Sequence, residues 1–202
     1  WHIECSAMSL KYLTDVFNEQ FHPENIPTID IHTGGEDNKF PHHECEIAQS
    51  EGSTGQKLVN YWLHVTHLLV EGEKMSKSLG NIYTLPDILD MEYKPEAVRY
   101  VLLTTHYRQK LNFTFKSLQA AQNAIERLQE LIFNLKHIEN EKGDFEAREF
   151  AENVKEDFLE ELDNDLNIAG AIGVLFDAVK TINKSLPDIG KQDAEILLDL
   201  LK

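Results

Sequence analysis

The chain has 202 residues, of which 42% are hydrophobic, so it is long enough for one large domain or two small ones around a sizeable core. It contains no run of 18 or more apolar residues, and its first residues lack the basic and apolar regions of a signal peptide, which argues against a membrane or secreted protein. The net charge of −16 at first argues against a nucleic-acid partner, and two cysteines are too few for a disulfide framework.

The first part of the chain alternates between short strand and helix patterns. Strands are expected where polar and apolar residues alternate, and helices where apolar residues recur every three or four positions. The expected elements are a strand end over 2–5, a helix over 6–19, a proline-containing loop over 21–28, a strand over 28–32, a glycine-rich turn over 33–37, and a helix that begins near Pro41 and ends near Gly52. Strand, glycine turn and helix in this order are typical of a nucleotide-binding α/β unit.

The second part becomes helical. The apolar run over 60–70 predicts one buried strand, and from residue 115 onward the apolar period is that of amphipathic helices. Helices are expected over 85–89, 95–104, 115–135, 145–162, 168–182 and 192–201. We therefore divide the chain into an α/β part over 1–93, a connecting segment over 94–114 and a helical bundle over 115–202.

A polar loop follows the apolar run and reads Lys74-Met75-Ser76-Lys77-Ser78. Its ammonium groups can neutralise the phosphate charge that develops when pyrophosphate leaves, and its hydroxyls can donate hydrogen bonds to phosphate oxygens. For two lysines alone, a solvated surface loop is the simpler interpretation. We call these five residues the lysine loop.

Three residues form a possible zinc site. His42 and Glu46 are four residues apart on an expected helix and so share one face, and Cys5 is expected at the end of the early strand. A thiolate, an imidazole and a carboxylate are suitable ligands for tetrahedral zinc, and they leave its fourth coordination position open. Acidic residues at a helix start and paired histidines also occur without a metal.

The glycine-rich turn is a possible nucleotide site. Gly34 and Gly35 allow a ligand to approach the backbone closely, and the Asp37 carboxylate can accept hydrogen bonds from ribose hydroxyls. An ordinary turn between a strand and a helix explains the same residues equally well.

Four motifs in one order carry a resemblance to a known family. They are Trp1-His2-Ile3-Glu4-Cys5-Ser6-Ala7-Met8, Ile31-His32-x-Gly34-Gly35-x-Asp37, Phe40-Pro41-His42-His43-Glu44-x-Glu46-Ile47-Ala48-Gln49-Ser50, and the lysine loop. Together they resemble the cysteinyl-tRNA synthetases, which are class I aminoacyl-tRNA synthetases with a KMSKS signature. The resemblance covers nearly the whole chain. It implies an α/β fold, namely the C-terminal part of a Rossmann-like catalytic domain, followed by an α-helical bundle.

The resemblance also implies roles for individual residues. Zn²⁺ would be held by Cys5, His42 and Glu46 and would bind the substrate thiolate, which distinguishes cysteine from serine because a neutral hydroxyl is a poor ligand. Cys45 would be a bystander. By the same resemblance, Lys77 would bind ATP with support from Lys74 and Ser76. The adenylate site would lie at Gly34, Gly35 and Asp37, and His32 would contact the amino acid or the adenylate. Trp1 would lie at the amino-acid pocket, although a buried core tryptophan is an equal alternative. Thr33 replaces a third glycine of the family, and a threonine disfavours positive φ.

The implied activity is ATP-dependent ligation of L-cysteine to tRNA(Cys) through a cysteinyl-adenylate, with Mg²⁺ accompanying ATP, in a cytoplasmic monomer that does not bind membranes. The family's His-x-Gly-His motif and a further cysteine ligand do not occur here, nor does its small C-terminal module. We therefore expect the chain to be a segment of a longer enzyme and to be inactive alone. One alternative is a related ligase that joins cysteine to a sugar amine, as in mycothiol biosynthesis. A second is a non-catalytic fragment that binds tRNA or metal.

Charge is distributed unevenly along the helical part. Residues 94–116 carry a local excess of four positive charges with aromatic residues between them, whereas residues 139–165 carry an excess of nine negative charges. The basic segment would face the inner corner of the tRNA or, equally, would buttress the lysine loop, and the acidic surface would face away from RNA. The pattern from Asp163 to Lys180 resembles the helical domain that such synthetases place against the anticodon stem.

Overall fold

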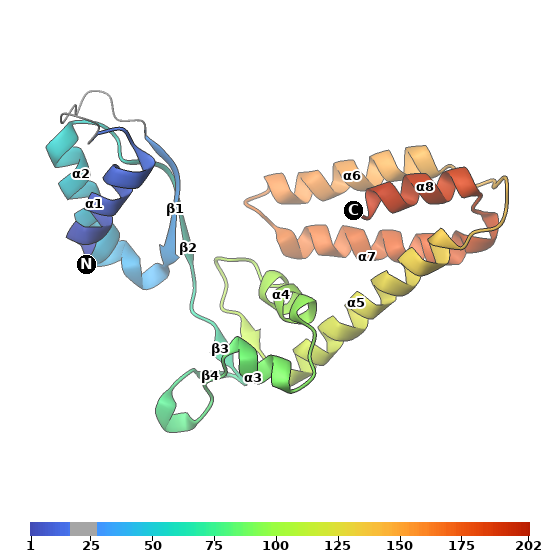
Figure 1. Ribbon diagram of the computed structural model, residues 1–202, viewed down its shortest axis with the longest axis horizontal. Coiled ribbons are helices and arrows are strands. Elements are labelled where there is room, and N and C mark those ends of the chain that lie inside the picture. Colours follow the sequence, from blue (N-terminus) through green and yellow to red (C-terminus); the bar gives the residue numbers. More distant parts are fainter. Residues whose placement is uncertain (17–27) are drawn as a thin grey trace. The chain divides into compact units, whose positions relative to one another are not determined.

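The computed structural model describes residues 1–16 and 28–202, which form two compact units (Figure 1). The first unit comprises Trp1–His67 together with Tyr107–Lys110, and the second comprises Leu68–His106 together with Leu111–Lys202. No helix in these ranges is long and apolar enough to cross a membrane.

The first unit is a strand–helix–strand unit with one additional helix. Its elements are α1 (His2–Leu13), β1 (Ile29–Gly35), the short helical turns η2 (Glu36–Asn38) and η3 (Lys39–His43), α2 (Glu44–Thr54) and β2 (Val59–Val65). The two strands are parallel, as a connection through a helix requires, and α1 packs against α2. Apolar residues at the starts of both strands, Ile29 and Val59, are buried with Leu10 of α1 and fix the register of the pair.

Two expectations for this unit are wrong. Residues 2–5 are helical and continue into α1, because four residues of alternation are too few to distinguish the two periods and packing of Ser6 and Leu10 decides the helix. The glycine-rich turn expected over 33–37 is also wrong in part, because the strand expected over 28–32 is confirmed and extends to Gly35. The second helix is confirmed and ends at Thr54, two residues after Gly52, since Gly55 adopts the left-handed conformation (φ 69°) that closes a helix. The expected α1 residues 17–19 and nearly all of the expected loop over 21–28 lie outside the described residues.

The second unit contains a small sheet and the expected helices. The apolar run over 60–70 is divided between β2 and a second strand rather than forming one strand, because Thr66 to Leu68 interrupt it. The elements are β3 (Leu69–Val70), β4 (Glu73–Lys74), η4 (Lys77–Leu79), α3 (Leu85–Asp90), α4 (Pro95–Leu103), β5 (Asn112–Phe113), α5 (Phe115–Lys136), α6 (Ala147–Asp163), α7 (Ile168–Ser185), η5 (Leu186–Asp188) and α8 (Lys191–Leu200). All six expected helices are confirmed, with ends shifted by a few residues.

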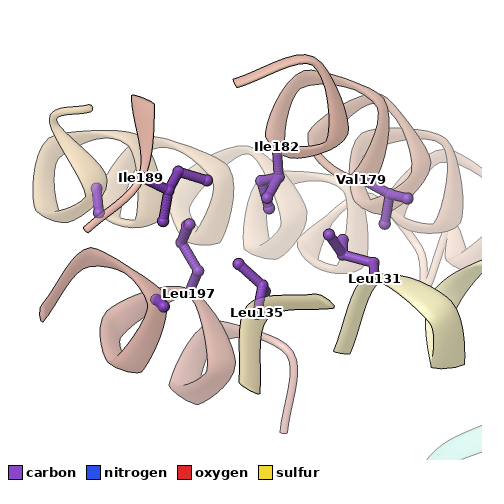
Figure 2. Packing of buried hydrophobic residues seen from close by; sticks show 8 residues of the cluster. Leu131, Leu135, Val179, Ile182, Ile189 and Leu197 are labelled. Carbon is purple, nitrogen blue, oxygen red and sulfur yellow. The ribbon is translucent and has the colours of Figure 1, made fainter. Parts of the chain in front are cut away.

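One apolar core holds the end of α5 together with α6, α7 and α8. Leu131 and Leu135 of α5 point toward Val179 and Ile182 of α7 and Leu197 of α8, as Figure 2 shows. These side chains are almost completely buried, which is what the helical spacing of apolar residues predicts.

Replacing Leu131 with alanine is expected to lower the free energy of unfolding by about 2–5 kcal/mol, because Leu131 is 0% exposed and its removal leaves a cavity. Denaturant unfolding followed by circular dichroism measures this loss. Leu159→Ala is the matched control, since Leu159 on α6 is 47% exposed. Equal losses in the two variants would contradict this account of the core.

Candidate metal and nucleotide site

The functional side chains of the first unit lie between the β1–β2 pair and the start of α2. His32 of β1 lies opposite Trp62 of β2, and Gly34 lies opposite His64, so alternation places His32, Trp62 and His64 on one face. The η3 turn brings His42 and His43 toward that face. A side chain at Gly34 would lie 2.6 Å from Cε1 of His43, so glycine is required here to admit the histidine ring.

Glu46 is at the centre of this arrangement. Its side chain is almost completely buried, and its two carboxylate oxygens each lie 3.3 Å from a histidine nitrogen, Nε2 of His42 and Nε2 of His32. Neither oxygen accepts a hydrogen bond of good geometry from any described residue. A buried carboxylate without donors is costly unless a cation compensates its charge.

The fold brings together the three zinc ligands that were expected from the sequence. The ligand atoms of Cys5, His42 and Glu46 all lie within 4.8 Å of one another. Cys5 lies in the first turn of α1, not at the end of a strand, so the expected element is wrong although the residue is correctly placed. Burial, then the negative charge of Glu46 and the interaction of the thiol with its carboxylate, raise the pKa of the Cys5 thiol. The orphaned carboxylate and this donor set fit Zn²⁺, which takes thiolate, imidazole and carboxylate ligands.

Two further histidines belong to the site and were missed from the sequence. The buried His43 ring packs edge-on against His32, and its Nδ1 lies 2.8 Å from Nε2 of His64, so one of these nitrogens donates a hydrogen bond to the other. Burial, and then the charges of the neighbouring histidines, lower the pKa of His43 to about 4, so its ring is neutral at pH 7. The available signal was the alternation in β2, which places Trp62 and His64 on the face of His32.

The nucleotide candidates lie around the end of β1. Thr33 is an ordinary strand residue and has no positive φ, so the missing third glycine requires no unusual backbone there. Asp37 follows in η2, and its Oδ1 lies 3.7 Å from Nε2 of His67. Trp1 is 89% exposed and directly precedes α1, so the alternative of a buried core tryptophan is wrong.

The lysine loop belongs to the second unit and begins at Lys74, the last residue of β4. The side-chain amide of Asn81 spans the loop: its Oδ1 accepts from the Ser76 backbone N–H at 2.8 Å, and its Nδ2 donates to the Lys74 carbonyl at 3.3 Å. The Ser76 hydroxyl caps η4 by accepting from the Leu79 N–H. Lys74 and Lys77 are exposed, whereas Met75 lines an apolar pocket of about 450 Å³ with residues of α3 and α4. Asn81 was not recognised from the sequence.

Comparison with models of known protein families identifies the family of this chain. A model of the catalytic domain of class I (C) tRNA synthetases matches residues 1–123, and a model of the DALR domain matches residues 157–202. The chain belongs to the class I (C) tRNA synthetase family. The resemblance seen in the sequence and the fold class expected from it are thereby confirmed, whereas the expected domain limits remain predictions.

Curated relatives of this synthetase chain include cysteine–tRNA ligases. It is 49% identical to that of Brachyspira hyodysenteriae and 42% identical to that of Protochlamydia amoebophila, in both cases over 100% of its own length and over 41% and 40% of theirs. The chain therefore spans about two fifths of the length of these relatives. Among solved structures it is similar to a LeuRS of Agrobacterium radiobacter in complex with tRNA and LeuAMS, with a TM-score of 0.69 and 19% identity over 97% of this chain and 28% of that one. That likeness shows the fold alone.

Proposed function

We propose that this chain is part of an enzyme that ligates L-cysteine to tRNA(Cys) at the expense of ATP, through a cysteinyl-adenylate. The observation that carries the proposal is the buried Glu46 carboxylate, which accepts no well-formed hydrogen bond from the described residues and is grouped with Cys5 and His42 in a chain of this family. Such a site selects a soft, anionic ligand, and among amino-acid side chains the cysteine thiolate fits it best.

Cys5, His42 and Glu46 would hold Zn²⁺, which supplies a Lewis acid that prefers a thiolate to a hydroxyl and so rejects serine. The remaining residues of the site keep these ligands in place. His32 lies beside one Glu46 oxygen, and the neutral His43 is fixed by His64 and by the Trp62 ring, whose centroid lies 4.9 Å away. Trp1 would contribute to the amino-acid pocket, and His32 would contact the amino acid or the adenylate.

The exposed Lys77 and Lys74 would bind the triphosphate of ATP, carried with Mg²⁺, and stabilise the charge that grows on pyrophosphate as it leaves. Ser76 would support them. Gly34, Gly35 and Asp37 would receive the adenylate. The helical bundle would bind the tRNA, and the enzyme would act as a cytoplasmic monomer.

Replacing Asn81 with alanine in the native protein is expected to lower the rate of adenylate formation about tenfold, because the two hydrogen bonds that hold the lysine loop can no longer form. Cysteine-dependent ATP–pyrophosphate exchange measures the rate. Asn123→Ala is the control, since Asn123 is exposed on α5 away from the loop. A wild-type rate for Asn81→Ala would show that the loop does not depend on this amide.

The experiment that tests the function is charging of total tRNA with labelled cysteine by the native protein that contains this sequence, with this chain alone in parallel. We expect the native protein to charge tRNA with cysteine and to refuse serine, and the chain alone to make no adenylate. A native protein that makes adenylate but charges no tRNA would favour the sugar-amine ligase instead. Exchange activity of the chain alone would refute its expected inactivity.

A further inference from the structure

Four residues from the middle of the sequence belong to the first unit, about 40 residues after the rest of that unit ends. Tyr107–Lys110 folds with Trp1–His67, whereas the residues on both sides of it belong to the second unit. Backbone carbonyls anchor this segment: the Thr66 N–H donates to the Tyr107 carbonyl at 3.2 Å, and the Thr66 hydroxyl lies 3.2 Å from the Arg108 carbonyl oxygen. The side chains of Arg108 and Lys110 are not needed for either hydrogen bond. We call Tyr107–Lys110 the crossing segment.

The anchor lies at the carboxyl edge of the β1–β2 pair. Thr66 directly follows β2, and its hydroxyl is also 3.3 Å from Oε2 of Glu36, which directly follows β1. In open α/β sheets, ligands bind outside the carboxyl ends of parallel strands. The crossing segment therefore borders the place where the proposed adenylate and the acceptor that attacks it would meet.

Two carboxylates give this edge negative charge, which the cations of the crossing segment offset. Glu36 and Asp37 lie there, and the whole chain carries a net charge of −16. Arg108 and Lys110 are both exposed, and the Arg108 guanidinium lies over the Tyr107 ring at 5.1 Å from its centroid. A planar guanidinium binds phosphate through paired hydrogen bonds, and cations beside an aromatic ring are typical of sites for single-stranded nucleic acid.

We propose that the crossing segment binds the 3′-terminal nucleotides of the RNA substrate, with Arg108 and Lys110 on their phosphate groups. The proposal rests on the proposed function and adds to it a binding site for the acceptor end. RNA is favoured over ATP because Lys74 and Lys77 already provide the cations for the triphosphate. An aromatic ring beside the guanidinium also offers a stacking surface, which a chain of nucleotides can use and a triphosphate cannot.

The test compares Arg108→Gln and Lys110→Gln with Lys57→Gln in the native protein. Lys57 is an exposed lysine of the same unit, just before the amino end of β2, and serves as the matched control. Each test variant is expected to raise the KM for tRNA about tenfold and to leave the KM for ATP in pyrophosphate exchange unchanged. The slope of log affinity against log salt for tRNA, measured by fluorescence anisotropy, should become shallower by about 0.7 for each phosphate group that the variant no longer neutralises.

The outcomes separate this site from the function itself. Arg108→Lys should recover part of the affinity, whereas unchanged tRNA affinity and salt slope in Arg108→Gln and Lys110→Gln would overturn the proposal. An equal rise in the KM for ATP would also overturn it, because the cations would then serve the triphosphate. If the wild-type protein charges no tRNA, the proposed function fails, and the anisotropy measurement still decides whether the segment binds RNA. Thermal unfolding of each variant confirms that the fold is kept.

Discussion

Replacing Glu46 with glutamine is expected to lower the zinc affinity of the native protein about 100-fold or more and to lower cysteine activation with it. The amide keeps the volume of the side chain but removes the negative charge that faces His42 and His32, each 3.3 Å away. Because the Glu46 side chain is only 2% exposed, a water molecule cannot take the place of its carboxylate as a ligand. Zinc per chain measured by mass spectrometry after dialysis, and cysteine-dependent pyrophosphate exchange, report the two effects.

Two controls accompany this variant. Glu44→Gln changes an exposed acid in the first turn of the same helix, and Cys45→Ser removes the thiol that we interpret as a bystander. Both should keep zinc at the wild-type level. Full zinc retention in Glu46→Gln would refute the ligand set, and loss of zinc in Cys45→Ser would show that the second cysteine is a ligand.

Replacing Lys77 with alanine in the native protein is expected to lower kcat for adenylate formation about 100- to 1,000-fold and to leave the KM for cysteine unchanged, because the ammonium group acts on charge that develops in the transition state. The lysine loop itself should persist, since Asn81 and Ser76 hold it through hydrogen bonds that do not involve the Lys77 side chain. Steady-state pyrophosphate exchange over a range of cysteine and ATP concentrations separates the two parameters.

Lys142→Ala is the matched control, because Lys142 is an exposed lysine of the same unit that lies between α5 and α6. It should leave kcat unchanged. A variant Lys77→Ala in which only the KM for ATP rises would mean that the lysine binds ATP equally in the ground state and the transition state, and the role proposed for it would be wrong.

The long helices were the part of the fold that local pattern could predict. α5 runs over 22 residues, and apolar residues such as Leu118, Leu131 and Leu135 recur at helical spacing along it, so several turns agree on one buried face. The short elements were predicted less well. Residues 2–5 are too few to distinguish the strand period from the helix period. The run over 60–70 is mostly apolar, although residues 66–68 separate it into two strands.

The sequence by itself determined the chemistry that this protein offers: a thiol, an imidazole and a carboxylate in one set, a loop with two lysines and two serines, and the order of motifs that places the chain in its family. Only the tertiary structure decided how these groups are used. Four features each join residues from separate elements: the buried Glu46 carboxylate beside His32 and His42, the neutral His43 held by His64, the Asn81 amide across the lysine loop, and the Thr66 anchor of the crossing segment. The physical reason is that exposure, charge and hydrogen bonding depend on neighbours in space, whereas a sequence pattern reports only neighbours along the chain.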